Sequence, residues 1–116
     1  YIKGSIVTYS NEAKMKFLDV DKEILDTKGA VSPEVAKQMA EGVRKAVGSD
    51  IGVGITGIAG PTGGTDKKPV GLVYIAVAGK DNTVVKENVF SGDRARVRYR
   101  STQQALEMIR QYIKNK

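Results

Sequence analysis

Lys14 is the residue of this chain whose type and position could most directly support catalysis. The 116 residues include no cysteine and no histidine, so a proton-transferring group must be Ser, Thr, Tyr, Lys, Arg, Asp or Glu. If Ser10 caps a helix, Lys14 lies near the positive end of the helix dipole, where a neutral amine is favoured over a cation. A neutral lysine can act as a general base, and Tyr9 is close to it in sequence. The same spacing also fits a surface lysine on an amphipathic helix.

A glycine-rich loop is the second candidate for chemistry. Seven glycines fall within twenty residues, between two runs rich in Val and Ile: Gly52, Gly54, Gly57, Gly60, Gly63, Gly64 and Gly71. Such a loop lets main-chain N–H groups approach an anionic ligand closely. Thr56 opens this loop, so its hydroxyl could orient a substrate while glycine N–H groups bind a phosphate or an oxyanion. A plain turn in which Thr56 satisfies its own backbone is an equal alternative.

The known nucleotide-binding motifs do not account for these glycines. Gly52, Gly54 and Gly57 spell a literal G-x-G-x-x-G, but in a dinucleotide-binding fold that pattern follows a strand and opens a helix. Here it lies within the predicted strand and is followed by Gly, Pro and Thr, which cannot begin a regular helix. No acidic residue occurs near position 77, and no G-K-[ST] sequence is present. We therefore reject a Rossmann or P-loop site.

The charge and composition of the chain limit the classes of binding partner that it could have. The net charge is +6, and the densest positive segment contains Arg94, Arg96, Arg98 and Arg100, a pattern that equally fits a solvated helix start. Only 6% of residues are aromatic, which argues against a nucleic-acid partner that binds by base stacking. The absence of Cys and His removes the usual ligands of zinc, and no apolar run has the length of a membrane span or a signal peptide. We expect a cytoplasmic domain without a metal site built from Cys or His.

The elements that must position these residues alternate between helix and strand. We expect a strand over Gly4–Tyr9, a helix over Asn11–Leu18 and a short helix that stops at Gly29. A clearer helix begins after Ser32 and ends at Gly48, with a buried stripe of Val35, Ala36, Met39, Ala40, Val43, Ala46 and Val47.

The second half adds three strands and a last helix. Ile51–Thr56 and Val70–Ala78 are predicted strands, the second covered on both faces, and Thr83–Phe90 is a predicted edge strand. A last helix follows Asp93, with a predicted buried stripe of Val97, Ala105, Leu106, Ile109, Tyr112 and Ile113. This order predicts a single α/β domain, a three-layer α/β/α sandwich with a mixed sheet.

Four segments resemble the C-terminal domain of the CinA competence/damage-inducible proteins. They are VTYSNEAK at 7–14, GAVSPEV at 29–35, TGIAGPTGGTDKKPVG at 56–71 and FSGDR at 90–94, and their order covers essentially the whole chain. The resemblance implies a three-layer α/β/α fold and a nicotinamide-nucleotide amidase. Such an enzyme hydrolyses the carboxamide of nicotinamide mononucleotide to nicotinate mononucleotide and ammonia, without a metal or cofactor.

The resemblance also implies roles for individual residues. Lys14 resembles the catalytic base that activates a serine, Tyr9 its neighbour in the active site, and Thr56 a substrate-contacting residue. The adjacent loop, with Gly57, Gly60, Gly63 and Gly64, would line the site. Arg94 and Arg98 resemble the basic contacts to the substrate phosphate.

The nucleophilic serine is the missing part of this pattern. In the family, a segment with an ESCTGG-like motif precedes the strand at which this chain begins, and neither Ser5 nor Ser10 fits that motif. We expect the nucleophile to lie upstream of Tyr1, and this chain alone to be catalytically incomplete. The lack of an initiator Met agrees with an excised portion of a longer protein, which could carry a fused N-terminal domain or form a homo-oligomer. The alternatives are a non-catalytic nucleotide-binding or regulatory module and, with less support, a nucleic-acid-binding domain.

Overall fold

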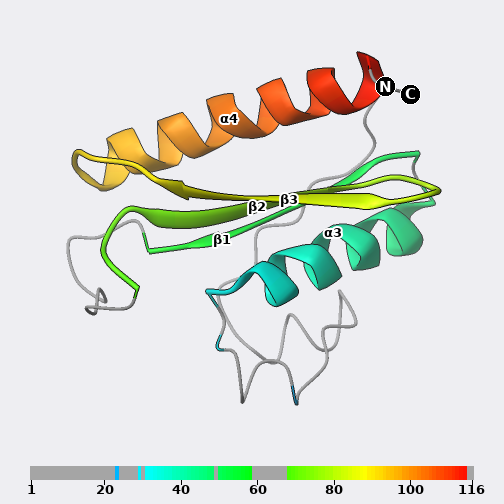
Figure 1. Cartoon of the computed structure of the whole chain (residues 1–116), viewed down its shortest axis with the longest axis horizontal. Coiled ribbons are helices and arrows are strands. Elements are labelled where there is room, and N and C mark those ends of the chain that lie inside the picture. The colour runs from blue at the N-terminus through cyan, green and yellow to red at the C-terminus, as the bar shows by residue number, and fades with distance from the viewer. Residues whose placement is uncertain (1–22, 24–28, 30, 49, 59–67, 115–116) are drawn as a thin grey trace.

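The described part of the chain forms three layers. The computed structural model describes residues 23, 29, 31–48, 50–58 and 68–114. In chain order these contain α3 (Pro33–Val47), β1 (Gly52–Gly57), β2 (Leu72–Ala78), β3 (Thr83–Val89) and α4 (Arg94–Lys114). Figure 1 shows the sheet between α3 on one face and α4 on the other. The predicted α/β/α sandwich is therefore confirmed.

The three described strands pair in the order β1-β2-β3, and both pairs are antiparallel. The strand expected over Gly4–Tyr9, which would have to supply the parallel pairing of a mixed sheet, lies outside the described residues. The helix expected over Asn11–Leu18 lies outside them too. β2 is buried along nearly its whole length, as predicted, and β3 is a polar terminal strand of the described sheet.

Local chemistry sets both ends of α3. The Ser32 side chain accepts a hydrogen bond from the Val35 N–H at 3.3 Å, and Pro33 occupies the first turn. Gly48 ends the helix in the left-handed conformation, with φ of 69°, and its N–H donates to the carbonyl of Arg44 at 2.9 Å. Both ends of α3 agree with the sequence prediction.

The predicted stripe of α3 is correct for its first three turns and wrong at Ala46. Five of its members are buried: Val35, Ala36, Met39, Ala40 and Val43. Ala46 is exposed. Gly52, the first residue of β1, lies against Ala40 and Arg44, so the last turn of the helix extends past the start of the strand. The side chain of Val47 lies outside the described part.

The two faces of the sheet are packed with side chains of different size. On the α3 face, the helix contributes Ala36 and Ala40, and β2 contributes Ala76 and Ala78. On the α4 face, the sheet contributes the larger Val73, Ile75 and Val77, with Val53 and Ile55 of β1 beside them. The alternation of small and large residues along β1 and β2 therefore brings α3 much closer to the sheet than side chains of ordinary size would allow.

Gly52 and Gly54 make this close approach possible. A Cβ at Gly54 would lie 2.7 Å from the main-chain N of Ala40 and 2.9 Å from Cβ of Met39, and closer still to the carbonyl oxygen of Ala36. A Cβ at Gly52 would collide with the carbonyl of Ala40. These two glycines of the G-x-G-x-x-G pattern therefore serve helix packing, in agreement with the rejection of a Rossmann site.

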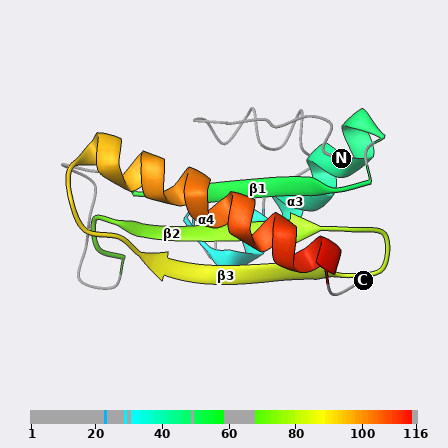
Figure 2. The ribbon, with the colours of Figure 1, turned by 90° about the horizontal axis from the view of Figure 1, so that it is seen from above.

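The predicted buried stripe of α4 is correct at Val97, Ala105, Ile109 and Tyr112 and wrong at its other two members. The buried residues are Val97, Ser101, Ala105, Met108, Ile109 and Tyr112. Leu106 and Ile113, predicted to be buried, are 48% and 46% exposed. Met108 and Ser101 take the inward positions, and the hydroxyl of Ser101 is satisfied by donating to the carbonyl of Val97 at 2.7 Å. Figure 2 shows α4 crossing the strands obliquely, with its N-terminus at the end of the sheet where β1 stops.

Candidate functional site at one end of the sheet

The candidate site residues that the structure describes lie at the end of the sheet where β1 stops and β2 begins. The N-terminus of α4 lies at this end, and the first turn of α3 lies nearer to it than the last turn does (Figure 1). Thr56 and Gly57 are the last two residues of β1, and Arg94 is the first residue of α4. The structure thus places the last residues of β1 and the first residue of α4, which lie far apart in sequence, at the same end of the sheet.

Thr56 lies on the α3 face of the sheet. It belongs to the same alternating set of β1 residues as Gly52 and Gly54, and it is only 7% exposed. The next residue, Gly57, is exposed, and a Cβ there would lie 2.7 Å from the carbonyl oxygen of Leu72. Thr56 is therefore a buried hydroxyl group at the point where the chain leaves the sheet.

Main-chain hydrogen bonds hold the two ends of the glycine loop together. The N–H of Ile58 donates to the carbonyl of Leu72 at 2.9 Å, and the N–H of Gly71 donates to the carbonyl of Ile58 at 2.6 Å. Gly71 has φ of 95° and accepts from the N–H of Phe90 at 2.8 Å. A Cβ at Gly71 would collide with the carbonyl of Phe90, so only glycine fits this junction. The loop therefore starts and ends at a fixed position.

The N-terminus of α4 combines an acidic cap with an excess of positive charge. Asp93 caps the helix, since its Oδ1 accepts from the N–H of Arg96 at 2.9 Å and its carbonyl accepts from the N–H of Val97 at 2.9 Å. The first turn contains no acidic residue. Arg94 and Arg98 are exposed and lie four residues apart, so they share one face of the helix. Cations are disfavoured at a helix N-terminus, and an anion bound there would relieve their repulsion.

Thr56 and Arg94 nevertheless start from opposite faces of the sheet. Thr56 points toward the α3 face, and α4 covers the other face. A single ligand could contact both residues only by reaching around the end of the sheet.

Tyr74 and Glu87 form a polar pair beside Thr56 that the sequence did not reveal. The phenol of Tyr74 donates to Oε1 of Glu87 at 2.7 Å, and Tyr74 is the cross-strand partner of Thr56. The hydrogen bond to Glu87, partial burial and the negative charges of Glu87 and Glu34 raise the pKa of Tyr74 to about 12. Tyr74 therefore remains a neutral donor at physiological pH. Only the strand register, which the sequence does not state, brings these two residues together.

The remaining predicted site residues cannot be placed against this geometry. Lys14, Tyr9, Gly60, Gly63 and Gly64 lie outside the described residues. Their roles remain predictions.

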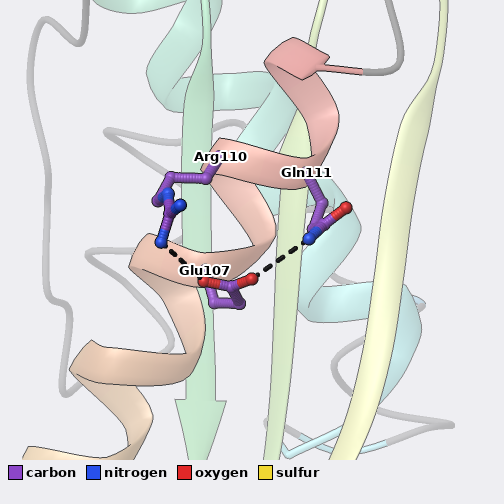
Figure 3. Close-up of polar contacts among 3 residues, drawn as sticks. All are labelled: Glu107, Arg110 and Gln111. Carbon is purple, nitrogen blue, oxygen red and sulfur yellow. Dashed lines mark hydrogen bonds and ion pairs between the residues drawn. The ribbon is translucent and has the colours of Figure 1, made fainter.

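A groove of about 600 Å³ lies away from this end, between α4 and the β3 hairpin, and is lined by residues that include Asn82, Lys86, Gln104 and Tyr112. Glu107 also lines this groove. It accepts hydrogen bonds from Arg110 at 3.3 Å and Gln111 at 3.1 Å, as Figure 3 shows. The ion pair between Arg110 and Glu107 is exposed and therefore contributes little to the stability of the fold. The groove shares no residue with the candidate site.

Within the described ranges, the structure shows neither a metal site nor a membrane-spanning helix. No group of three acidic side chains among residues 31–48, 50–58 and 68–114 is placed to hold a metal ion. Of the helices that the structure describes, none combines the length and the apolar character needed to cross a membrane.

Comparison with known proteins identifies relatives over nearly the whole chain. The family model described as the CinA C-terminal domain matches residues 1–113. A Moorella thermoacetica protein, provisionally named a competence-damage inducible protein, is 56% identical over 109 residues, which are 94% of this chain and 26% of the relative. A CinA-like protein of Syntrophomonas wolfei is 51% identical over 115 residues, which are 99% of this chain and 28% of the relative.

Solved structures of CinA-type proteins also match the fold of this chain. The competence/damage inducible protein CihA of Agrobacterium tumefaciens has a TM-score of 0.86 at 41% identity, over 88% of this chain and 63% of that one. A CinA superfamily protein of Enterobacter cloacae has a TM-score of 0.85 at 32% identity, over 90% of this chain and 62% of that one. The chain thus spans about a quarter of the curated relatives and less than two thirds of the solved ones.

Proposed function

Since this chain belongs to the family of CinA C-terminal domains, we propose that it forms the substrate-binding and base-supplying part of a nicotinamide-nucleotide amidase. The reaction is hydrolysis of the carboxamide of nicotinamide mononucleotide to nicotinate mononucleotide and ammonia. The observation that carries the proposal is the position of Thr56. Its buried side chain lies where the glycine loop leaves β1, at the same end of the sheet as the N-terminus of α4 with its arginines.

The elongated shape of the substrate suits this arrangement. Nicotinamide mononucleotide carries its amide at one end and its phosphate at the other. Arg94 and Arg98 would bind the phosphate at the N-terminus of α4, where the helix dipole adds to their charge. Thr56 would contact the nicotinamide end, with N–H groups of the glycine loop at the carbonyl oxygen.

The proposed chemistry uses a serine and a lysine. The neutral amine of Lys14 would take the proton of a serine hydroxyl as its oxygen attacks the amide carbon, and Tyr9 is the proposed neighbour of this pair. The proton then passes to the departing nitrogen, the C–N bond breaks, and ammonia leaves an acyl-serine. Water attacks this ester, and its proton returns to the serine oxygen as nicotinate mononucleotide is released. We place the serine in sequence that precedes Tyr1.

An ammonia-release assay with nicotinamide mononucleotide tests the proposal. It compares this chain, the natural polypeptide that carries it, and a Lys14→Ala variant of that polypeptide. We expect no turnover by the chain alone, turnover by the longer polypeptide, and a loss of about 100-fold to 10,000-fold in kcat for Lys14→Ala, because a general base is removed. Lys14→Arg, which keeps the charge but cannot lose its proton, should be equally inactive.

Other outcomes point to other functions. Turnover by the chain alone that Lys14→Ala abolishes would place the nucleophile within these 116 residues. A longer polypeptide that binds the nucleotide without releasing ammonia would support the binding or regulatory module. Affinity for DNA with a steep salt dependence would support a nucleic-acid-binding domain.

A further inference from the structure

Thr56 is the first member of a polar row that crosses the described sheet. Thr56 of β1 pairs with Tyr74 of β2, and Tyr74 pairs with Glu87 of β3. Residues directly opposite each other on neighbouring strands project from the same face. Tyr74 packs against the alanine cluster beneath α3, so the row lies on the α3 face. The row therefore extends from the candidate site along one face of the sheet.

The row is locally acidic in a chain of net positive charge. Glu87 accepts a hydrogen bond from the Tyr74 phenol at 2.7 Å, and Glu34, in the first turn of α3, adds a second negative charge that acts on Tyr74. The phenol oxygen has committed its only proton to Glu87. Toward any other group, it can therefore act only as a hydrogen-bond acceptor.

We propose that Tyr74, held by Glu87, makes the site beside Thr56 selective for an uncharged amide over a carboxylate; this inference rests on the proposed function. A carboxamide has N–H groups to donate to the phenol oxygen, whereas a carboxylate has only acceptors. The carboxylates of Glu87 and Glu34 also repel a negatively charged ligand group. Because the proposed reaction converts an amide into a carboxylate at this position, the row would retain the substrate and expel the product.

Binding measurements on this chain test the selectivity without requiring turnover. Nicotinamide mononucleotide and nicotinate mononucleotide differ only in the amide and the carboxylate, and each is titrated calorimetrically into the unmodified chain and Glu87→Gln. Glu107→Gln is the matched control, because it removes the same charge beside the groove between α4 and the β3 hairpin. Circular dichroism checks that each variant is folded.

We expect Glu87→Gln to bind nicotinate mononucleotide about threefold to tenfold more tightly, with little change for nicotinamide mononucleotide. The size of the effect follows from one partly screened charge about two strand spacings, or roughly 10 Å, from Thr56. Tyr74→Phe removes the acceptor oxygen and should weaken the amide nucleotide several-fold while the carboxylate nucleotide changes little. Glu107→Gln should leave the ratio of the two affinities unchanged.

An equal gain for both nucleotides, or the same response in Glu107→Gln, would indicate a general charge effect and overturn the selectivity. An unchanged ratio in Glu87→Gln, with both nucleotides bound, would overturn this inference and leave the proposed function standing. If the unmodified chain binds neither nucleotide, both proposals fail.

Discussion

Gly54→Ala is the substitution for which the structure makes the sharpest prediction. The added Cβ would lie 2.7 Å from the main-chain N of Ala40 and 2.9 Å from Cβ of Met39, whereas ordinary van der Waals contact begins at 3.4 Å. The nearest atoms belong to the backbone of α3, which cannot rotate away as a side chain would. The helix must therefore move away from the sheet.

The movement of α3 determines how much Gly54→Ala lowers the free energy of unfolding. Overpacking a well-packed interior costs about 1–3 kcal/mol, and a clash with backbone belongs at the upper end of that range. The alanine also restricts the unfolded chain, which returns about 0.4–1 kcal/mol. We therefore expect Gly54→Ala to lower the free energy of unfolding by roughly 2 kcal/mol. With a urea m-value near 1–2 kcal/mol/M, the midpoint of urea unfolding should fall by about 1–2 M.

Gly48→Ala is the matched control. It places the same Cβ where no atom lies within 4 Å, so the only native-state cost is the left-handed conformation at φ of 69°, about 1 kcal/mol. Urea unfolding followed by circular dichroism should give a smaller loss for Gly48→Ala than for Gly54→Ala. The packing explanation is refuted if Gly54→Ala costs no more than the control. If Gly54→Ala instead abolished nucleotide binding at unchanged stability, the glycine would serve a ligand.

Three further predictions concern packing, capping and titration. Met108→Ala should cost about 2–3 kcal/mol in urea unfolding and Leu106→Ala less than about 1 kcal/mol, because only Met108 is buried; equal losses would contradict the orientation of α4. Asp93→Ala should lower the unfolding free energy by about 1 kcal/mol, and Asp93→Ser, which keeps a capping oxygen, should lose much less. An unchanged unfolding free energy in Asp93→Ala would show that the cap does not stabilise α4. The hydrogen bond to Glu87 raises the pKa of Tyr74 from 10.0 to about 12, so the stabilisation is complete below pH 10 and is lost as the pH rises through 12. The stability advantage of the unmodified chain over Tyr74→Phe should therefore shrink by roughly 1 kcal/mol across that range, allowing for solvent screening; a constant difference would disprove the contact with Glu87.

The elements of the described chain and the resemblance to a family could be read from local patterns. Ser32 and Gly48 mark the ends of α3 through interactions within four residues, and the β-branched runs mark β1 and β2. Thr56 is a candidate because it ends one of these runs. The positions of Lys14 and Tyr9 relative to it remain predictions.

Local sequence by itself determined where these helices and strands lie, because caps, turns and side-chain periodicity act over a few residues. Only the tertiary structure decided that Met108 rather than Leu106 faces the sheet, that Gly54 serves α3, and that Tyr74 meets Glu87. Leu106 and Met108 differ by about 200° in direction around the axis of α4, so packing against the sheet decides which of them is covered. Strand register likewise depends on contacts between residues far apart in the chain, and no short segment specifies it.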